Sequence, residues 1–176
     1  IVKSRLMNTI FFFFFDLTAD RLENIAEEII RFRPKIIYGY PTAIYLLARH
    51  LEHRQALLRE IRLNVIMITA EWITSEQRWL IEKVFRTPTV DEYGCSETGG
   101  FAYECPHRSL HISCESVLVE FLDAGGMPVK TGSCGQIVVT DLRNKYMPLI
   151  RYRVGDTGFA VTGGCHCGRS LPAMRL

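Results

Sequence analysis

The sequence predicts an α/β protein with a parallel sheet and crossover helices, followed by an antiparallel β region. Up to about residue 100, short runs rich in β-branched residues alternate with segments whose apolar residues repeat at helical spacing. After Phe85 no helical pattern occurs, and strand-like runs are separated by the glycine pairs Gly125-Gly126 and Gly163-Gly164. We therefore expect an α/β subdomain at 1–105 and a mostly β subdomain at 106–176, both within one large domain.

The first segment with a clear pattern is the aromatic run at 10–15, which is typical of a buried strand or a buried connector. A helix is predicted next, with Asp20 as its N-cap and Glu23 as the capping-box partner. Its apolar stripe is formed by Leu22, Ile25, Ala26, Ile29 and Ile30. Pro34 ends this helix because proline cannot continue the backbone hydrogen bonds.

Two more helices follow in the first half. The second begins near Pro41, a residue favoured in the first helical turn. The third begins after Thr74, which forms a capping box with Gln77, and runs to about Phe85. Strands are predicted at 35–38, 64–69, 89–93, 117–122, 136–142, 148–152 and 158–161. Strands that alternate with helices are typical of a parallel sheet.

Composition excludes several classes of protein. The chain has 176 residues, 48% of them apolar and 23% charged, which is typical of a folded domain rather than of disorder. The net charge of +2 gives no basic footprint for nucleic acid. The longest apolar run is far shorter than the roughly 20 residues that a membrane span needs. Six cysteines are too few for a disulfide scaffold, which favours the cytoplasm.

The loop at 93–100 combines an aromatic ring, hydroxyls, a carboxylate and glycines directly after a predicted parallel strand. In open parallel sheets, ligands bind beyond the carboxyl ends of the strands. Glycines let backbone amides approach a phosphate, a hydroxyl can donate to it, and the Glu97 carboxylate can hold Mg²⁺. The alternative is a glycine-rich turn with a solvated glutamate.

Two further segments carry similar chemistry. Arg151-Tyr152-Arg153-Val154-Gly155-Asp156 ends a predicted strand, and an aspartate there can accept both hydroxyls of a ribose. The alternative is an ordinary β-turn aspartate. Thr69-Ala70-Glu71 ends the strand that we expect to neighbour the one carrying Tyr93.

These segments, in this order, resemble the adenylate-forming ligases, and most of all the phenylacetate–coenzyme A ligase branch with its capsular-polysaccharide-type relatives. The resemblance is carried by Arg33-Pro34, Gly39-Tyr40-Pro41, Ala70-Glu71, Tyr93-Gly94-Cys95-Ser96-Glu97, Glu104-Cys105, Leu110-His111, Arg151-Tyr152-Arg153 with Asp156, and Cys165-His166-Cys167-Gly168-Arg169.

The resemblance implies a role for each matching residue. Ala70 and Glu71 would border the adenine, Tyr93 would stack on it, and Asp91 is a further candidate for its edge. Gly94 belongs to the same nucleotide-binding group.

By the same resemblance, Ser96 would contact the phosphate and Glu97 would hold Mg²⁺, which makes these two the catalytic candidates. Asp156 would bind the ribose hydroxyls, and Tyr40 would line the pocket for the acid substrate. The implied reaction is attack of a carboxylate on the α-phosphate of ATP, with release of pyrophosphate and later transfer to coenzyme A.

Three departures from the family pattern modify this expectation. No Ser/Thr/Gly-rich phosphate loop precedes Tyr93, position 69 is threonine where the family often has glycine, and the family's small domain with a catalytic lysine would follow Leu176. We therefore expect a piece of a longer protein, covering the middle and rear of the large domain. Such a piece would hold part of the nucleotide site and would not turn over by itself.

A second group of residues indicates a metal. Cys105 and His111 lie close in sequence, and Cys165 and Cys167 lie in a glycine-rich turn. Thiolates and imidazoles at such spacings suit a tetrahedral structural Zn²⁺, with His107 as the substitute for His111. Alternatively, the cysteines are small apolar groups in the core. Cys95, Cys114 and Cys134 are predicted to be packing residues.

Two functions from different classes remain after this reasoning. One is part of an ATP-dependent acid–coenzyme A ligase, whose partners are a small carboxylic acid, ATP and coenzyme A. The other is a non-catalytic interaction module stabilised by zinc. Neither function calls for nucleic acid or a membrane, and a homodimer stays open. Binding of ATP or AMP distinguishes the two.

Overall fold

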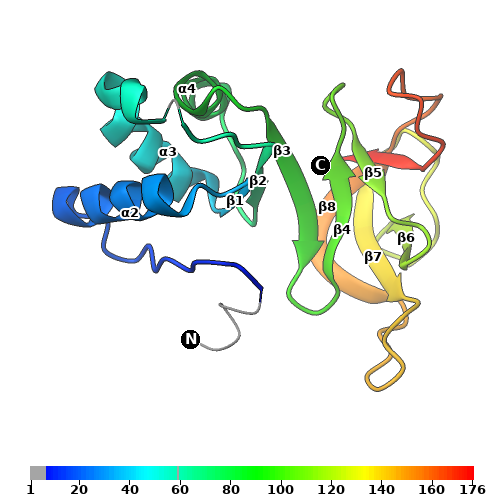
Figure 1. Cartoon of the computed structure of the whole chain (residues 1–176). Helices are drawn as coiled ribbons and strands as arrows, with labels where there is room; N and C mark the ends of the chain where they lie inside the picture. Colours follow the sequence, from blue (N-terminus) through cyan, green and yellow to red (C-terminus); the bar gives the residue numbers. More distant parts are fainter. Residues whose placement is uncertain (1–6, 59) are drawn as a thin grey trace. The chain divides into compact units, whose positions relative to one another are not determined.

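The computed structural model describes residues 7–58 and 60–176, which form two compact units. The first unit comprises the described residues up to Ile66 together with Glu71–Thr89, and the second comprises Met67–Ala70 and Val90–Leu176. The expected α/β class is confirmed, with parallel strands first and antiparallel strands after them (Figure 1). The predicted subdomain boundary at residue 105 stays a prediction.

Three α-helices dominate the described part of the first unit. They are α2 (Ala19–Phe32), α3 (Pro41–Leu51) and α4 (Ser75–Phe85), and a 3₁₀ segment, Glu52–Leu58, follows α3. The strand β1 (Ile36–Gly39) lies next to β2 (Val65–Thr69), whose first two residues belong to this unit. Helix α3 packs against both α2 and α4 (Figure 1). Within the described residues, no helix has the length and apolar character needed to cross a membrane.

The helix ends agree with the predictions except at one cap. Thr74 and Gln77 form the predicted capping box, and Pro41 occupies the first turn of α3. The N-cap of α2, however, is Thr18, whose hydroxyl accepts from the Arg21 amide. Asp20 instead lies in the first turn, where its charge favours the positive end of the helix dipole. The prediction of Asp20 as the cap is therefore wrong by two residues.

The aromatic run at 10–15 is not buried. It forms no strand, and Phe11, Phe13 and Phe15 are 68%, 72% and 88% exposed. Ile10 and Phe14 are half-buried, and the Phe14 ring lies 4.5 Å from that of Tyr40, centroid to centroid. The expectation of a buried strand or connector is therefore wrong within the part of the chain that is described.

The second unit is built of β-strands that follow the order β2-β3-β4-β5-β9-β8-β7-β6. Every neighbouring pair in this order, from β3–β4 to β7–β6, is antiparallel. Their bounds are β3 (Thr89–Cys95), β4 (Gly99–Glu104), β5 (Leu110–Ile112), β6 (Val117–Leu122), β7 (Gly135–Asp141), β8 (Tyr152–Ala160) and β9 (Ala173–Arg175). The apolar core of this unit consists of Tyr93, Phe101, Ala102, Leu110, Ile112, Val117, Ile137, Val139 and Met174.

Several strand predictions need correction. Strands β4, β5 and β9 were not foreseen, and the loop predicted at 94–100 is a tight hairpin between β3 and β4 (Figure 1). The strand predicted at 148–152 is wrong except for its last residue, because 148–151 form no strand. The strand predicted at 158–161 is the end of β8, which begins at Tyr152 and pairs irregularly with β7 near Gln136. Asp156 therefore lies within a strand, beside a bulge, and not at a strand end. Bulges re-aim side chains and are common beside binding sites.

Candidate functional site

Tyr93 joins the core of the second unit to the candidate nucleotide residues. Its ring is 9% exposed and meets Phe101 edge to face, at 5.2 Å between centroids. Its hydroxyl donates to Asp156 Oδ2 at 2.9 Å, across 63 residues of sequence. Burial and the adjacent carboxylate raise the pKa of Tyr93 well above its ordinary value. The phenol therefore stays protonated and remains a hydrogen-bond donor to Asp156 at physiological pH.

Glu97 lies in the β3–β4 hairpin loop and is exposed. Its Oε1 accepts a hydrogen bond of 2.7 Å from the hydroxyl of Tyr152, at the start of β8. This hydrogen bond is the main cause of the lowered pKa of the Glu97 carboxyl. The loop is therefore linked to β8 by an ionised carboxylate, which is the kind of group that a divalent cation prefers.

The loop itself is shaped by Gly94. A Cβ at this position would lie 2.2 Å from the carbonyl oxygen of Gly99, so no larger residue fits without moving the backbone. Cys95 Sγ and Thr98 Oγ1 are 3.2 Å apart and close the loop. This leaves Ser96 exposed at its tip, next to Glu97.

The end of β2 contributes to the same unit. The hydroxyl of Thr69 donates to Glu92 Oε1 at 3.3 Å, which places it beside the strand that carries Tyr93, as expected. Ala70 follows with φ of 65°, a left-handed conformation that is uncommon for a residue with a Cβ. It is exposed.

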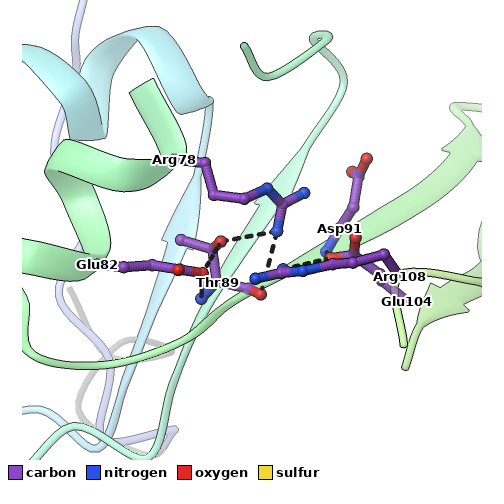
Figure 2. A network of polar contacts seen from close by, with 6 residues as sticks. All are labelled: Arg78, Glu82, Thr89, Asp91, Glu104 and Arg108. Carbon is purple, nitrogen blue, oxygen red and sulfur yellow. Dashed lines mark hydrogen bonds and ion pairs between the residues drawn. The ribbon is translucent and has the colours of Figure 1, made fainter. Parts of the chain in front are cut away.

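Asp91 is tied to a buried carboxylate. Its backbone amide donates to Glu104 Oε2 at 3.0 Å, and Arg108 forms an ion pair with the same oxygen at 3.2 Å (Figure 2). Glu104 is only 8% exposed, so these donors offset the cost of burying its charge. Glu104 immediately precedes Cys105, so the carboxylate that accepts from the Asp91 amide is next in sequence to one of the predicted metal ligands.

Figure 2 also shows polar contacts within the first unit. There, Thr89 accepts from Arg78 Nη1 at 2.8 Å and contacts Glu82 Oε1 at 2.7 Å through its hydroxyl. The Thr89 amide also donates to Glu82, at 2.9 Å. These bonds attach the beginning of β3 to α4 and involve no predicted site residue.

The remaining two candidates lie in the first unit. Glu71 Oε2 accepts from the amide of Thr42, in the first turn of α3, at 3.2 Å. Tyr40 is the N-cap residue of the same helix, and its ring packs on Phe14. Their predicted contacts with adenine and with the acid substrate stay predictions.

The four predicted metal ligands converge in the second unit. The ligand atoms of Cys105, His111, Cys165 and Cys167 all lie within 4.8 Å of one another. His107 is exposed and does not belong to this group, so the geometry favours His111 over its substitute. Pairing of His111 with Ala173 across β5 and β9 brings together residues that are 62 positions apart in the sequence.

The details of the cluster match a tetrahedral metal. The Sγ atoms of Cys105 and Cys165 are 3.6 Å apart, close to the roughly 3.8 Å edge expected for a tetrahedron with Zn–S bonds of about 2.3 Å. His111 Nδ1 lies 3.0 Å from the carbonyl oxygen of Leu171, which leaves Nε2 directed at Cys167 Sγ, 3.3 Å away. Such an outer hydrogen bond is typical of metal-binding histidines. The donor set therefore fits Zn²⁺.

The structure differs from the sequence predictions at two cysteines, and it shows contacts of Tyr152 and Glu104 that were not predicted. Cys114 and Cys134 are exposed, so the expectation that they pack in the core is wrong. Tyr152 had no predicted role, although the spacing from Tyr152 to Asp156 repeats that from Tyr93 to Glu97. Glu104 also had no predicted role, because the sequence does not show which donors lie close enough to stabilise a buried carboxylate.

Comparisons with known proteins show what the chain is similar to. No model of a known protein family matches the chain. A phenylacetate–coenzyme A ligase from Thermus thermophilus is 31% identical over 148 residues, which are 81% of this chain and 33% of the relative. Protein CapK from Staphylococcus aureus is 27% identical over 140 residues, 78% of this chain and 29% of that protein.

Among solved structures, an open conformation of 2-hydroxyisobutyryl-CoA ligase, in complex with 2-HIB-AMP and CoA, matches with a TM-score of 0.79. It is 18% identical, and the match covers 98% of this chain and 39% of that one, which supports the fold alone. The resemblance to the phenylacetate–coenzyme A ligases is confirmed, and the chain spans about a third of the length of the curated relatives that it matches.

Proposed function

We propose that this chain is the part of an ATP-dependent carboxylic acid–coenzyme A ligase that binds the nucleotide. One observation carries the proposal: Asp156 and Glu97 are both held by tyrosine hydroxyls that link β8 to β3 and its hairpin loop. The sequence similarity to phenylacetate–coenzyme A ligases supports the choice of reaction. In that reaction a carboxylate oxygen bonds to the α-phosphorus of ATP and pyrophosphate leaves. The thiol sulfur of coenzyme A then bonds to the acyl carbon, the thiol loses its proton, and AMP leaves as the acyl–phosphate bond breaks.

Each residue has a proposed role. Asp156 accepts the ribose hydroxyls, and Ser96 donates to a phosphate oxygen. Ala70, Asp91, Tyr93 and Gly94, all in the second unit, border the base. For Glu71 and Tyr40, in the first unit, the proposed roles are those that the resemblance implies, at the adenine and in the acid pocket. Because Tyr93 is largely buried, the face that it offers to adenine is small in this structure.

Glu97 fits a Mg²⁺ role, because an exposed carboxylate is a ligand that this ion prefers. When bound, the ion would neutralise charge on the phosphates as pyrophosphate departs. The chain itself supplies positioning and charge, since little covalent chemistry falls to the protein in such transfers.

AMP binding tests this proposal and separates it from a non-catalytic module. Titration of the isotope-labelled chain with AMP, followed by NMR, should show weak binding with shifts around Tyr93 and Asp156. Asp156→Asn should weaken binding about tenfold or more, as loss of a charged acceptor implies. Asp123→Asn is the matched control, because it makes the same change in an exposed turn of the same unit. Equal affinities for the two variants would refute the assignment of Asp156.

The cysteine cluster supports a second, structural role. We infer that Cys105, His111, Cys165 and Cys167 hold one Zn²⁺ that joins the loop after β4 to the turn before β9. Four protein ligands leave no open position, which is the pattern of structural rather than catalytic zinc. This site is compatible with the ligase, and it would be the main feature of the rival interaction module.

A cytoplasmic location and binding of coenzyme A also belong to the proposal. All six cysteines are free, which fits a reducing compartment. A homodimer has no observation in its favour among the described residues. Measurement of the molar mass in solution would decide the oligomeric state.

A further inference from the structure

The two tyrosine–carboxylate contacts have a reciprocal arrangement. On one segment Tyr93 precedes Glu97 by four residues, and on the other Tyr152 precedes Asp156 by four. Each tyrosine donates to the acid of the opposite segment, at 2.9 Å and 2.7 Å. The two contacts differ in their surroundings, because Tyr93 lies in the core whereas Glu97 is exposed and Tyr152 half-buried.

We propose that Tyr152 is a positioning residue for Glu97, and that its hydroxyl holds the carboxylate ready for the divalent cation. This inference rests on the proposed function in one respect, the assignment of Mg²⁺ to Glu97. Nothing in the sequence similarity assigns a role to Tyr152. It would act only through Glu97 and would contact neither the nucleotide nor the cation.

The geometry supports this role. Glu97 has three rotatable side-chain bonds and lies at the tip of a short loop, so its carboxylate would otherwise sample many positions. Tyr152 is the first residue of β8, which pairs with β7, and its ring is rigid. The position of its hydroxyl is therefore nearly fixed. At 2.7 Å the hydrogen bond has the length expected of a strong, charge-assisted O–H···O contact. Part of the conformational entropy of the Glu97 side chain is therefore already lost before a cation binds.

A purely structural role for this contact is a weaker explanation. Polar pairs between exposed groups contribute little to the free energy of folding, because water competes for both partners. Removing the Tyr152 hydroxyl should therefore leave the fold almost unchanged. Its effect should instead be visible in the properties of Glu97.

The first test uses this chain. Glu97 is followed by carbon-detected NMR of its carboxyl group while the pH is lowered. In Tyr152→Phe the pKa of Glu97 should rise toward the ordinary value of 4.5. Tyr103→Phe is the matched control, because it removes the same atom from a tyrosine that donates to the Gly100 carbonyl instead. A Glu97 pKa that is the same in wild type and Tyr152→Phe would overturn the contact and the proposal with it.

The second test uses the longer protein that carries this chain and measures ATP–pyrophosphate exchange at varied Mg²⁺. Tyr152→Phe should raise the half-saturating Mg²⁺ concentration about fivefold, as loss of a hydrogen bond to a charged group implies. Glu97→Gln should raise it further. In the double variant, Tyr152→Phe should add nothing, because it acts through a carboxylate that is already gone.

The outcomes distinguish the two proposals. If Glu97→Gln changes the Mg²⁺ dependence and Tyr152→Phe does not, the positioning role is wrong and the proposed function stands. Additive effects in the double variant would also overturn positioning, because Tyr152 would then act independently of Glu97. If neither variant changes the Mg²⁺ dependence, the assignment of Mg²⁺ to Glu97 fails, and the role of Tyr152 fails with it.

Discussion

The two candidate sites in the second unit are built in opposite ways. The cysteine cluster is closed: Cys105 and His111 are buried, and the ligand atoms of all four residues lie within 4.8 Å of one another. The candidate nucleotide site is open, because Asp156 and Glu97 are exposed. Both carboxylates already accept a hydrogen bond from a tyrosine hydroxyl. On the proposed assignments, the first region depends on its metal ion for stability, whereas hydrogen bonds within the chain stabilise the second.

The largest expected effect tests the closed site. In the zinc-loaded protein, Cys165→Ser should lower the free energy of unfolding by roughly 3 kcal/mol or more, because structural zinc contributes directly to folding. Urea denaturation, combined with metal analysis, measures this. Cys134→Ser is the matched control, since that cysteine is exposed. If Cys165→Ser unfolds at the same urea concentration as wild type and retains its zinc, the site is misassigned.

A smaller loss is expected in the loop of the open site. Gly94→Ala should lower the free energy of unfolding by about 2 kcal/mol, because the new Cβ would overlap the Gly99 carbonyl oxygen and force the hairpin to shift. Thermal or urea denaturation measures the loss. Gly164→Ala provides the comparison, since a Cβ there meets nothing within 4 Å. Equal stability of both variants would show that the hairpin adjusts freely.

Removal of the Tyr93 hydroxyl should have a still smaller effect. Tyr93→Phe keeps the ring in the core and loses only the hydrogen bond to Asp156, so the free energy of unfolding should fall by about 1 kcal/mol. Tyr146→Phe, at a fully exposed tyrosine, should change nothing measurable. A loss as large as that of Cys165→Ser would mean that the open site also depends on its contacts for folding.

The smallest effect concerns pH. The pKa of Glu97 is lower in the folded protein than its ordinary value of 4.5, so its contribution to stability is present above that value. The contribution is lost as pH falls through the folded pKa, because the unfolded state then binds the proton more readily. Tyr152→Phe should therefore lose less stability than wild type when the pH is lowered from about 5 to about 3. An identical decrease in both proteins would contradict this linkage.

The local parts of the fold were predictable because they depend on neighbours in sequence. The stripe of α2 and the capping box at Thr74 follow from helical spacing alone. The N-cap of α2 was not predictable, because Thr18 and Asp20 are both good N-cap residues and the local sequence does not distinguish between them. The exposed run at 10–15 shows the same limit, since apolar character predicts burial only where something covers it.

The candidate sites were predictable as residue types and not as contacts. The four metal candidates were found from spacing, but their convergence depends on the pairing of β5 with β9, and β9 was not foreseen. Gly155-Asp156 has the composition of a turn, and the bulge that keeps it inside β8 is set by the register with β7. The role of Tyr152 depends on that register as well. Long-range pairing is therefore the part that the sequence alone does not determine.

Ala70 at the end of β2 has a consequence for the balance between stability and binding. A left-handed alanine costs roughly 1 kcal/mol more than a glycine in the same conformation, and every folded molecule carries that cost whether or not nucleotide is bound. Because Ala70 is exposed, its methyl group returns little through burial. The chain is thus less stable here than it would be with glycine at position 70.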